Sequence, residues 1–245
     1  MTENKIHINK GTDYTIINQN NLPLNVGILI FDEVEVLDVT GPFEVFAVTR
    51  LNEERRSNES SPFKLMLISE TLKTIFTTGG LRLTPDMTID NNVKLDLLIV
   101  PGGKGTRREV DNAKLIQWIS EKASGTPLTT SVCTGSHLLE KAGLLDGRIA
   151  TTHWNAFDYL RLSAPKAHIL TDVQFTMVEP IFTSAGVASG IDLSLRIVSY
   201  FFGTGVGQST AHYMQYPYPQ MNRWGRINTQ KTHPFTQRLD LSLYL

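Results

Sequence analysis

The segment LTTSVCTGSHLLEKAG, residues 128–143, joins a predicted buried strand directly to a helix. The strand predicted over 128–132 runs straight into Cys133, which small residues flank at Ser131 and Gly135. This pattern has the form of the GxSxG nucleophile elbow, a sharp strand-to-helix turn that exposes its central side chain. We expect the helix N-terminus to favour thiolate and so to lower the pKa of Cys133. The alternative is an inert cysteine, buried as a small hydrophobic residue.

The elements around this segment alternate between strands and helices. Strands are predicted at 25–31, 63–69, 95–100, 128–132 and 148–152, with two or three short ones across 168–185. Helices are predicted at 41–48, 112–123, 134–143, 155–161 and 188–203, and a hairpin at 74–83. Short apolar runs are typical of strands buried on both faces. The order of the elements therefore predicts an α/β fold, with a mostly parallel central sheet between two helical layers.

One α/β domain accounts for most of the chain. Its predicted bounds are 25–205, which leaves an N-terminal extension at 1–24 and a C-terminal tail at 206–245. The tail is rich in Tyr, Gln and Pro, and we expect it to pack on the domain or at a dimer interface. In the last long helix Ile191, Leu195, Val198 and Phe202 recur at helical spacing, which predicts one apolar face.

The composition excludes several classes of partner. Lys and Arg number 23 and Asp and Glu 24 in 245 residues, so no chain-wide charge favours nucleic acid or an anionic membrane. The apolar runs are far shorter than the roughly 20 residues that span a bilayer, and the polar N-terminus lacks a secretory signal core. A single cysteine is typical of a reducing compartment. We therefore expect a cytoplasmic protein with a small-molecule substrate and no nucleic-acid or membrane partner.

Two glycines follow the neighbouring strand at Pro101-Gly102-Gly103. Parallel strands bring their carboxyl ends to one edge of a sheet, where ligands bind. We expect the free N–H groups of Gly102 and Gly103 to lie beside Cys133 and, with the N–H of Thr134, to bind a developing negative charge. A plain glycine-rich turn is the alternative.

Asp38 is the candidate general acid or base. It follows the first strand by a short loop, so it can reach the same edge of the sheet as Cys133. There burial and a neighbouring thiolate would both raise the pKa of its carboxyl. The alternative is that Asp38 caps a helix that begins near Gly41. We expect Glu33 and Glu35, in the same loop, to face away from the site.

The six histidines contain no HxxxH or HExxH pair, so we expect no metal, and no nucleotide or flavin motif indicates another cofactor. His212 and His233 lack the HxE pattern of a class I glutaminase. His153 ends the strand predicted over 148–152 and can approach Cys133 as an accessory residue. A structural histidine is an equal alternative at that position.

Four segments together resemble the ThiJ/PfpI superfamily, which is class I glutamine amidotransferase-like. They are GILIFDEVEVLDVTGPFEVF (27–46), LDLLIVPGG (95–103), TTSVCTGSHLLEKAGLLDGRIATTHW (129–154) and TSAGVASGIDLSLRIV (183–198). Within the superfamily, the Asp38 loop, the Cys133-Thr134 pair and the ATTHW segment resemble the isocyanide (isonitrile) hydratase branch and the sensor domains of AraC-type regulators.

The resemblance implies a flavodoxin-like three-layer sandwich, a homodimer, and a cysteine nucleophile at Cys133 hydrogen-bonded to an acid at Asp38. Relatives of the protease-like type carry His directly after the cysteine, and Thr134 in its place disfavours peptidase activity. The leading interpretation is a cofactor-free hydratase, a lyase that converts an isocyanide to an N-substituted formamide. A glyoxalase or deglycase using Asp38, Cys133 and His153 is one alternative. The other is a non-enzymatic sensor that lacks the DNA-binding region of the regulators.

Overall fold

Seven strands form one central sheet in the computed structural model of the chain, in the order β10-β11-β7-β6-β1-β2-β5. The structure describes residues 22–218, so the predicted N-terminal extension up to residue 21 and the tail beyond 218 lie outside the described residues. The strands are Leu24–Leu29 (β1), Phe63–Ser69 (β2), Met87–Thr88 (β5), Leu97–Val100 (β6), Leu128–Val132 (β7), Phe175–Val178 (β10) and Ile181–Ser184 (β11). Neighbours pair in parallel except for β10 and β11, which are antiparallel.

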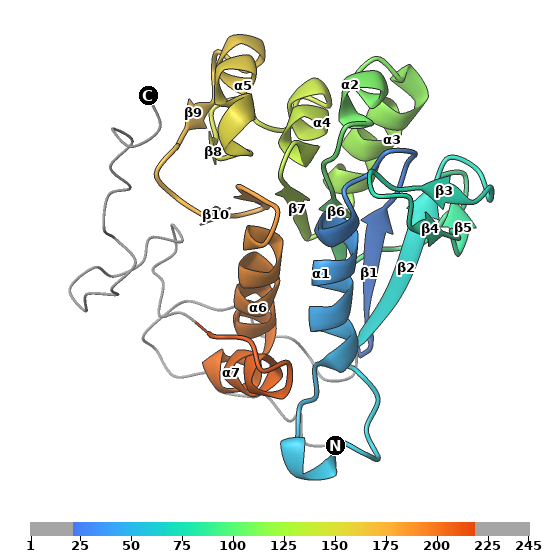
Figure 1. The fold of residues 1–245 in the computed structure, drawn as a ribbon, viewed down its shortest axis with the longest axis vertical. Coiled ribbons are helices and arrows are strands. Elements are labelled where there is room, and N and C mark those ends of the chain that lie inside the picture. Colours follow the sequence, from blue (N-terminus) through green and yellow to red (C-terminus); the bar gives the residue numbers. More distant parts are fainter. Residues whose placement is uncertain (1–21, 219–245) are drawn as a thin grey trace, which may run out of the picture.

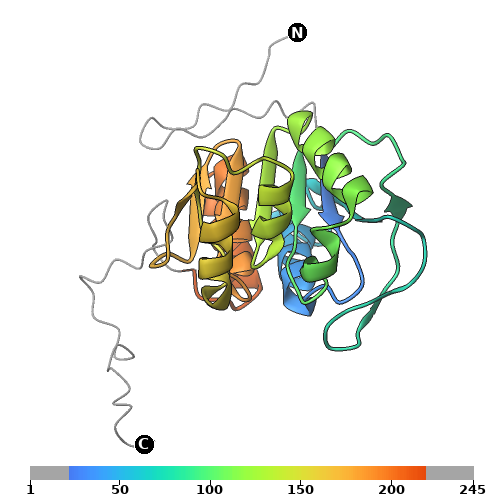
Figure 2. The same ribbon diagram turned by 90° about the horizontal axis from the view of Figure 1, so that it is seen from above.

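Helices cover both faces of this sheet, which confirms the predicted α/β sandwich. Figures 1 and 2 together show α1 and α6 on one face and α3 on the other. The α-helices are Val36–Val48 (α1), Thr106–Glu109 (α2), Ala113–Ser124 (α3), Gly135–Lys141 (α4), Phe157–Ser163 (α5), Ser189–Phe202 (α6) and Thr204–Tyr213 (α7), and Glu53–Arg55 (η2) and Trp154–Ala156 (η3) are 3-10 turns. Every side chain of β6 and β7 is buried, because helices exclude water from both faces of these central strands.

Three central strands deliver their following loops to one edge of the sheet. β1, β6 and β7 run in parallel, and their carboxyl ends meet at the upper edge in Figure 1. Val34, in the loop after β1, forms an isolated bridge with Gly103, in the loop after β6. The two loops are therefore held against each other beside the end of β7.

Two small sheets lie outside the central one. β3 (Ile75–Phe76) and β4 (Arg82–Leu83) form the predicted hairpin. β8 (Ile149–Ala150) pairs in parallel with β9 (His168–Ile169) and not with the main sheet. The strand predicted over 148–152 is therefore shorter than expected. Beyond it, the hydroxyls of Thr151 and Thr152 donate to the carbonyls of Leu170 and Cys133.

The first helix begins earlier than predicted. α1 starts at Val36, so Pro42 lies inside it rather than near its first turn. A proline within a helix removes the hydrogen bond to the carbonyl four residues earlier, which is that of Asp38. The helix tolerates this loss because it falls near its N-terminus. Since the helix starts at Val36, Asp38 is a residue of its first turn.

Around α6 the prediction of a single apolar face is incomplete. Leu193 and Ile197 are buried as fully as Leu195, because α1, α7 and the sheet surround this helix. α7 lies in a segment where we expected no helix, since Gly205 and Gly207 weaken the helical pattern. Gly207 is needed there because a Cβ atom would collide with Ser199 on α6.

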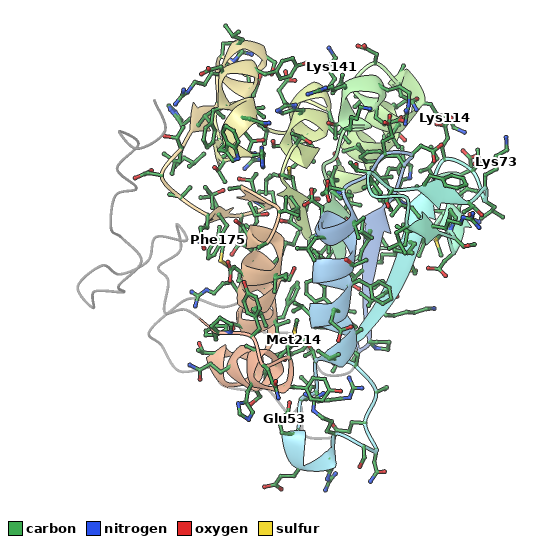
Figure 3. The ribbon with its side chains drawn as sticks, in the orientation of Figure 1. Glu53, Lys73, Lys114, Lys141, Phe175 and Met214 are labelled. Carbon is green, nitrogen blue, oxygen red and sulfur yellow. The ribbon has the colours of Figure 1, made fainter. Side chains whose placement is uncertain are left out.

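Figure 3 shows Met214, after α7, and Glu53, in η2, at the end of the molecule opposite Lys141.

None of the helices within residues 22–218 combines the length and the apolar composition needed to cross a bilayer.

Candidate active site

Cys133 occupies the sharp turn predicted between β7 and α4. Its φ of 56° lies in the left-handed region, which is uncommon for a residue other than glycine and stores backbone strain. Its N–H donates to the carbonyl of Ser184 (3.0 Å). Its carbonyl accepts the hydroxyls of Thr152 (3.1 Å) and Ser136 (3.2 Å). Three neighbouring elements thus hold the turn in place.

Glycines let other backbone segments approach this turn. A Cβ atom on Gly186 would lie 2.5 Å from the Cβ atom of Cys133 and 3.1 Å from its sulfur. A Cβ atom on Gly135 would collide with the carbonyl oxygen of Val100 at the end of β6. The loop before α6 therefore covers the sulfur, and Cys133 is only 6% exposed.

Asp38 is completely buried beside the elbow. Its Oδ2 accepts the backbone N–H of Gly102 (3.0 Å), while Glu35 is the N-cap residue of α1. The interpretation of Asp38 as a helix cap is therefore wrong. Burial raises the pKa of Asp38 from 3.8 to about 7, and the charge of Glu35 acts in the same direction. The hydrogen bond from Gly102 and the neighbouring Cys133 thiol oppose that rise.

The thiol of Cys133 has a raised pKa, so the predicted low pKa is wrong. Burial raises it from 9.0 to about 12, and the charge of Asp38 adds to the effect. The N–H and hydroxyl of Thr134 lower it, but they do not outweigh the loss of solvation. Near neutral pH the thiol is therefore protonated, and Asp38 is the member of the pair that changes its charge.

The N–H groups of the Pro101-Gly102-Gly103 turn already have acceptors. That of Gly102 bonds to Asp38, and that of Gly103 bonds to the hydroxyl of Thr134 (3.0 Å). The expectation that they are free is wrong, because Thr134 and Asp38 supply oxygen atoms within reach. Thr106 also donates to the Thr134 hydroxyl (3.2 Å). The role of the Gly102 and Gly103 N–H groups in binding a developing charge stays a prediction. It requires these N–H groups to give up their present acceptors for the charged atom of the substrate.

A cavity of about 600 Å³ opens onto the elbow. It brings together four of the predicted site residues, which are Cys133, Thr134, Gly103 and His153. Asp38 lies behind this wall, in contact with the thiol. The Nδ1 atom of His153 pairs with Oδ1 of Asn155 at 2.6 Å. Its participation in chemistry at Cys133 stays a prediction.

Glu35 and His137 are two ionisable cavity residues that the sequence did not lead us to expect there. Glu35 lines the cavity, although we expected it to face away. Glu33 is not among the lining residues, but it pairs at 3.1 Å with Lys104, which is one of them. His137 also lines the cavity, on the first turns of α4. The signal that could have found His137 was its position in the first turn of the helix that follows the Cys133 elbow.

Comparisons with known proteins agree with this geometry. The DJ-1/PfpI family model matches residues 25–200. The isonitrile hydratase of Pseudomonas putida is 31% identical over 199 residues, which are 80% of this chain and 79% of that protein. The regulator GbdR of Pseudomonas aeruginosa is 28% identical over 180 residues, and the match spans 74% of this chain but only 47% of the regulator.

A solved structure shows the same fold. A ThiJ/PfpI family protein from Pseudomonas syringae superimposes with a TM-score of 0.70 at 25% identity, covering 87% of this chain and 85% of that one. The family model covers well over half of the chain, and the fold and the elbow agree with it. The chain therefore belongs to the DJ-1/PfpI family.

Proposed function

We propose that the protein is a cysteine-dependent hydratase that converts an isocyanide to an N-substituted formamide. The observation that carries the proposal is the buried pair of Asp38 and Cys133 at the cavity, in which the carboxyl has a pKa of about 7. Such a group both accepts and donates a proton near neutral pH. The 31% identity to an isonitrile hydratase supports the same reaction class.

The first half of the reaction makes a covalent adduct. Ionised Asp38 takes the proton of the Cys133 thiol, with which it is in contact. The resulting carboxylic acid gives this proton to the isocyanide carbon, which becomes strongly electrophilic. The thiolate then bonds to that carbon, and the product is a thioimidate on Cys133. Asp38 is ionised again at the end of this step.

The second half consumes one water molecule. The water oxygen bonds to the thioimidate carbon, Asp38 accepts a water proton, and the substrate nitrogen receives that proton. The carbon–sulfur bond of the tetrahedral adduct then breaks, a carbonyl forms, and the hydroxyl proton returns to the sulfur. The atoms balance as isocyanide plus water giving formamide, and no external oxidant or reductant is needed. The backbone N–H of Thr134 is the donor that we propose for the adduct.

The test is formation of formamide, measured by mass spectrometry across a series of alkyl and aryl isocyanides. We expect wild-type protein to form it and Cys133→Ala to fall to the uncatalysed rate. Exposed His212→Leu on α7 is the control, because it lies in none of the cavity-lining elements. Absence of Cys133-dependent formamide from every isocyanide would overturn the proposal.

A glyoxalase or deglycase is a second candidate, and the observation that favours it is that His153 lines the same cavity as Cys133. The same variants are therefore assayed for conversion of methylglyoxal to lactate. The similarity to GbdR favours a third candidate, a sensor domain without turnover. Ligand binding with neither product would select this role.

We also propose that the protein forms a homodimer through a surface of its α/β domain. The proposal rests on the family membership, since the structure holds one chain. Sedimentation velocity tests it: we expect twice the mass of the 27.4 kDa chain, and a single species at the chain mass would contradict it.

A further inference from the structure

The side chain of His137 has a buried polar atom without a hydrogen-bond partner among the described residues, as Asp38 has behind the same cavity. It is only 8% exposed and lines the cavity that contains Cys133. Its Nε2 is completely shielded and has no hydrogen-bond partner within residues 22–218. Buried polar atoms without a partner are rare, and each one costs free energy in the folded protein. Core packing alone would be served better by leucine, which follows at positions 138 and 139.

Tyr159 of α5 fixes the orientation of this ring. The two ring centroids are 4.7 Å apart with an interplanar angle of 34°, and Tyr159 also lines the cavity. Such a contact between aromatic rings stabilises one ring position without using a ring nitrogen. The remaining hydrogen-bonding capacity of His137 is therefore held in a defined direction.

The protonation state of His137 follows from its burial. Burial lowers the pKa of its imidazole to about 4, so the ring is neutral near pH 7 and carries one N–H group. An unpaired buried N–H is less common than an unpaired acceptor. We therefore assign the proton to Nδ1, because only Nε2 is among the fully shielded atoms without a partner. Nδ1–H is then a donor at the cavity.

We propose that His137 is a specificity-determining residue that donates a hydrogen bond to an acceptor group on the substituent of the substrate. This inference rests on the proposed function for the identity of the reacting group. The other cavity residues fit such a substituent. Val110, Ala156 and Val187 present apolar surface, and a cavity of about 600 Å³ far exceeds the volume of the isocyanide group. The preferred substrates are aryl isocyanides that carry a carbonyl or ether oxygen on the ring.

The first experiment compares isocyanides of matched shape. Phenyl isocyanides with an acetyl group at the ortho, meta or para position are paired with the isopropyl analogues, which have nearly the same shape and no acceptor. We expect wild-type protein to favour at least one acetyl compound by about five- to tenfold in kcat/KM, the size of one neutral hydrogen bond. His137→Leu should abolish this preference while still converting the isopropyl compounds. His137→Gln, which keeps a donor, should restore part of it, and His212→Leu should keep all of it.

A second measurement separates this proposal from the reaction. Binding of acetophenone and of isopropylbenzene is followed by ligand-observed NMR, which requires no turnover. We expect acetophenone to bind more tightly to wild-type protein and to lose that advantage in His137→Leu. If no isocyanide is converted but this difference is found, the proposed reaction fails and the role of His137 stands. If His137→Leu unfolds at the wild-type temperature and keeps the wild-type preference in both measurements, the proposal is overturned.

Discussion

The β7–α4 and β1–α1 junctions bring their reactive groups to one point by different means. Cys133 is placed by its own turn, where the chain passes from strand to helix with a φ of 56°. Asp38 lies inside the first turn of α1 and is placed by a distant residue, Gly102, which donates to its carboxylate. One position is set by local backbone geometry and the other by packing of loops far apart in the sequence.

The difference explains which electrostatic effect prevails at the site. The helix that begins after Cys133 has only seven residues, and its N-terminal N–H groups favour thiolate by an amount that burial exceeds. At Asp38 the single N–H of Gly102 is likewise outweighed by burial. At both junctions burial therefore raises the pKa of the acidic group above its value in water, which supports the proposed exchange of one proton within the pair.

Asp38→Asn gives the largest expected effect. The amide keeps an acceptor for the Gly102 N–H but cannot exchange a proton with Cys133, so turnover should fall by about 10²- to 10⁴-fold. Formamide production and circular dichroism are measured together, with Glu44→Gln on the exposed side of α1 as the control. Activity within about threefold of wild type in a folded Asp38→Asn variant would contradict a proton-transfer role.

Stability should depend on pH through Asp38. Its folded pKa of about 7 lies above the value of 3.8 without burial, so the folded state binds the proton more tightly. The stabilising effect of that proton is complete below pH 3.8 and is lost as pH rises through 7. Asp38→Asn should therefore gain stability relative to wild type as the pH rises from 5 to 8, by about 2 to 3 kcal/mol at 1.36 kcal/mol per pH unit, with the gain levelling off above pH 7.

Urea unfolding of the two proteins at several pH values measures this difference. A free-energy difference between Asp38→Asn and wild type that stays constant from pH 5 to 8 would show that the carboxyl is not protonated in the folded protein.

The pKa of the Cys133 thiol tests whether burial or the helix N-terminus has the larger effect. Burial and then the charge of Asp38 raise the pKa of Cys133 to about 12, so the ultraviolet absorbance of thiolate should stay low at pH 9 in wild-type protein. Asp38→Asn removes the second cause and should shift the titration to lower pH. A thiolate already formed at pH 7 would mean that the helix N-terminus prevails, as the sequence alone led us to expect.

Local patterns in the sequence were enough to predict the elbow and most of the sheet. β2 and β7 match their predicted bounds, because β2 is a mostly apolar run after a polar loop and β7 ends at the elbow pattern around Cys133. The same reasoning missed α7, whose Gly207 lowers helix propensity but permits close packing against Ser199. Packing between helices outweighed the local preference there, and a single sequence carries no mark of it.

The chemistry of the site was less predictable than its residues. Cys133, Thr134 and His153 line the predicted cavity, but the thiol pKa was predicted in the wrong direction because Gly186 covers the sulfur. The loop that contains Gly186 is more than fifty residues from Cys133 in the chain. The acceptors of the Gly102 and Gly103 N–H groups also come from other loops. Electrostatics at the site thus depends on long-range contacts that spacing does not report.

The smallest expected effect tests how the elbow is held. The hydroxyl of Thr152 donates to the carbonyl of Cys133, whereas that of its neighbour Thr151 donates to the carbonyl of Leu170. Both residues are completely buried, so Thr152→Val and Thr151→Val should each cost about 1 kcal/mol of stability. Only Thr152→Val removes a hydrogen bond from the strained turn, because the hydroxyl of Ser136 is then the remaining hydroxyl donor to the carbonyl of Cys133.

The matched pair separates positioning from stability. Thr152→Val should change the rate of Cys133 alkylation and lower kcat several-fold, while Thr151→Val changes neither beyond its effect on folding. Unfolding free energies, alkylation rates and kcat are compared at one pH and temperature. Equal changes in both variants would mean that the elbow holds its geometry without Thr152, through the bond from Cys133 N–H to Ser184 and the covering loop at Gly186.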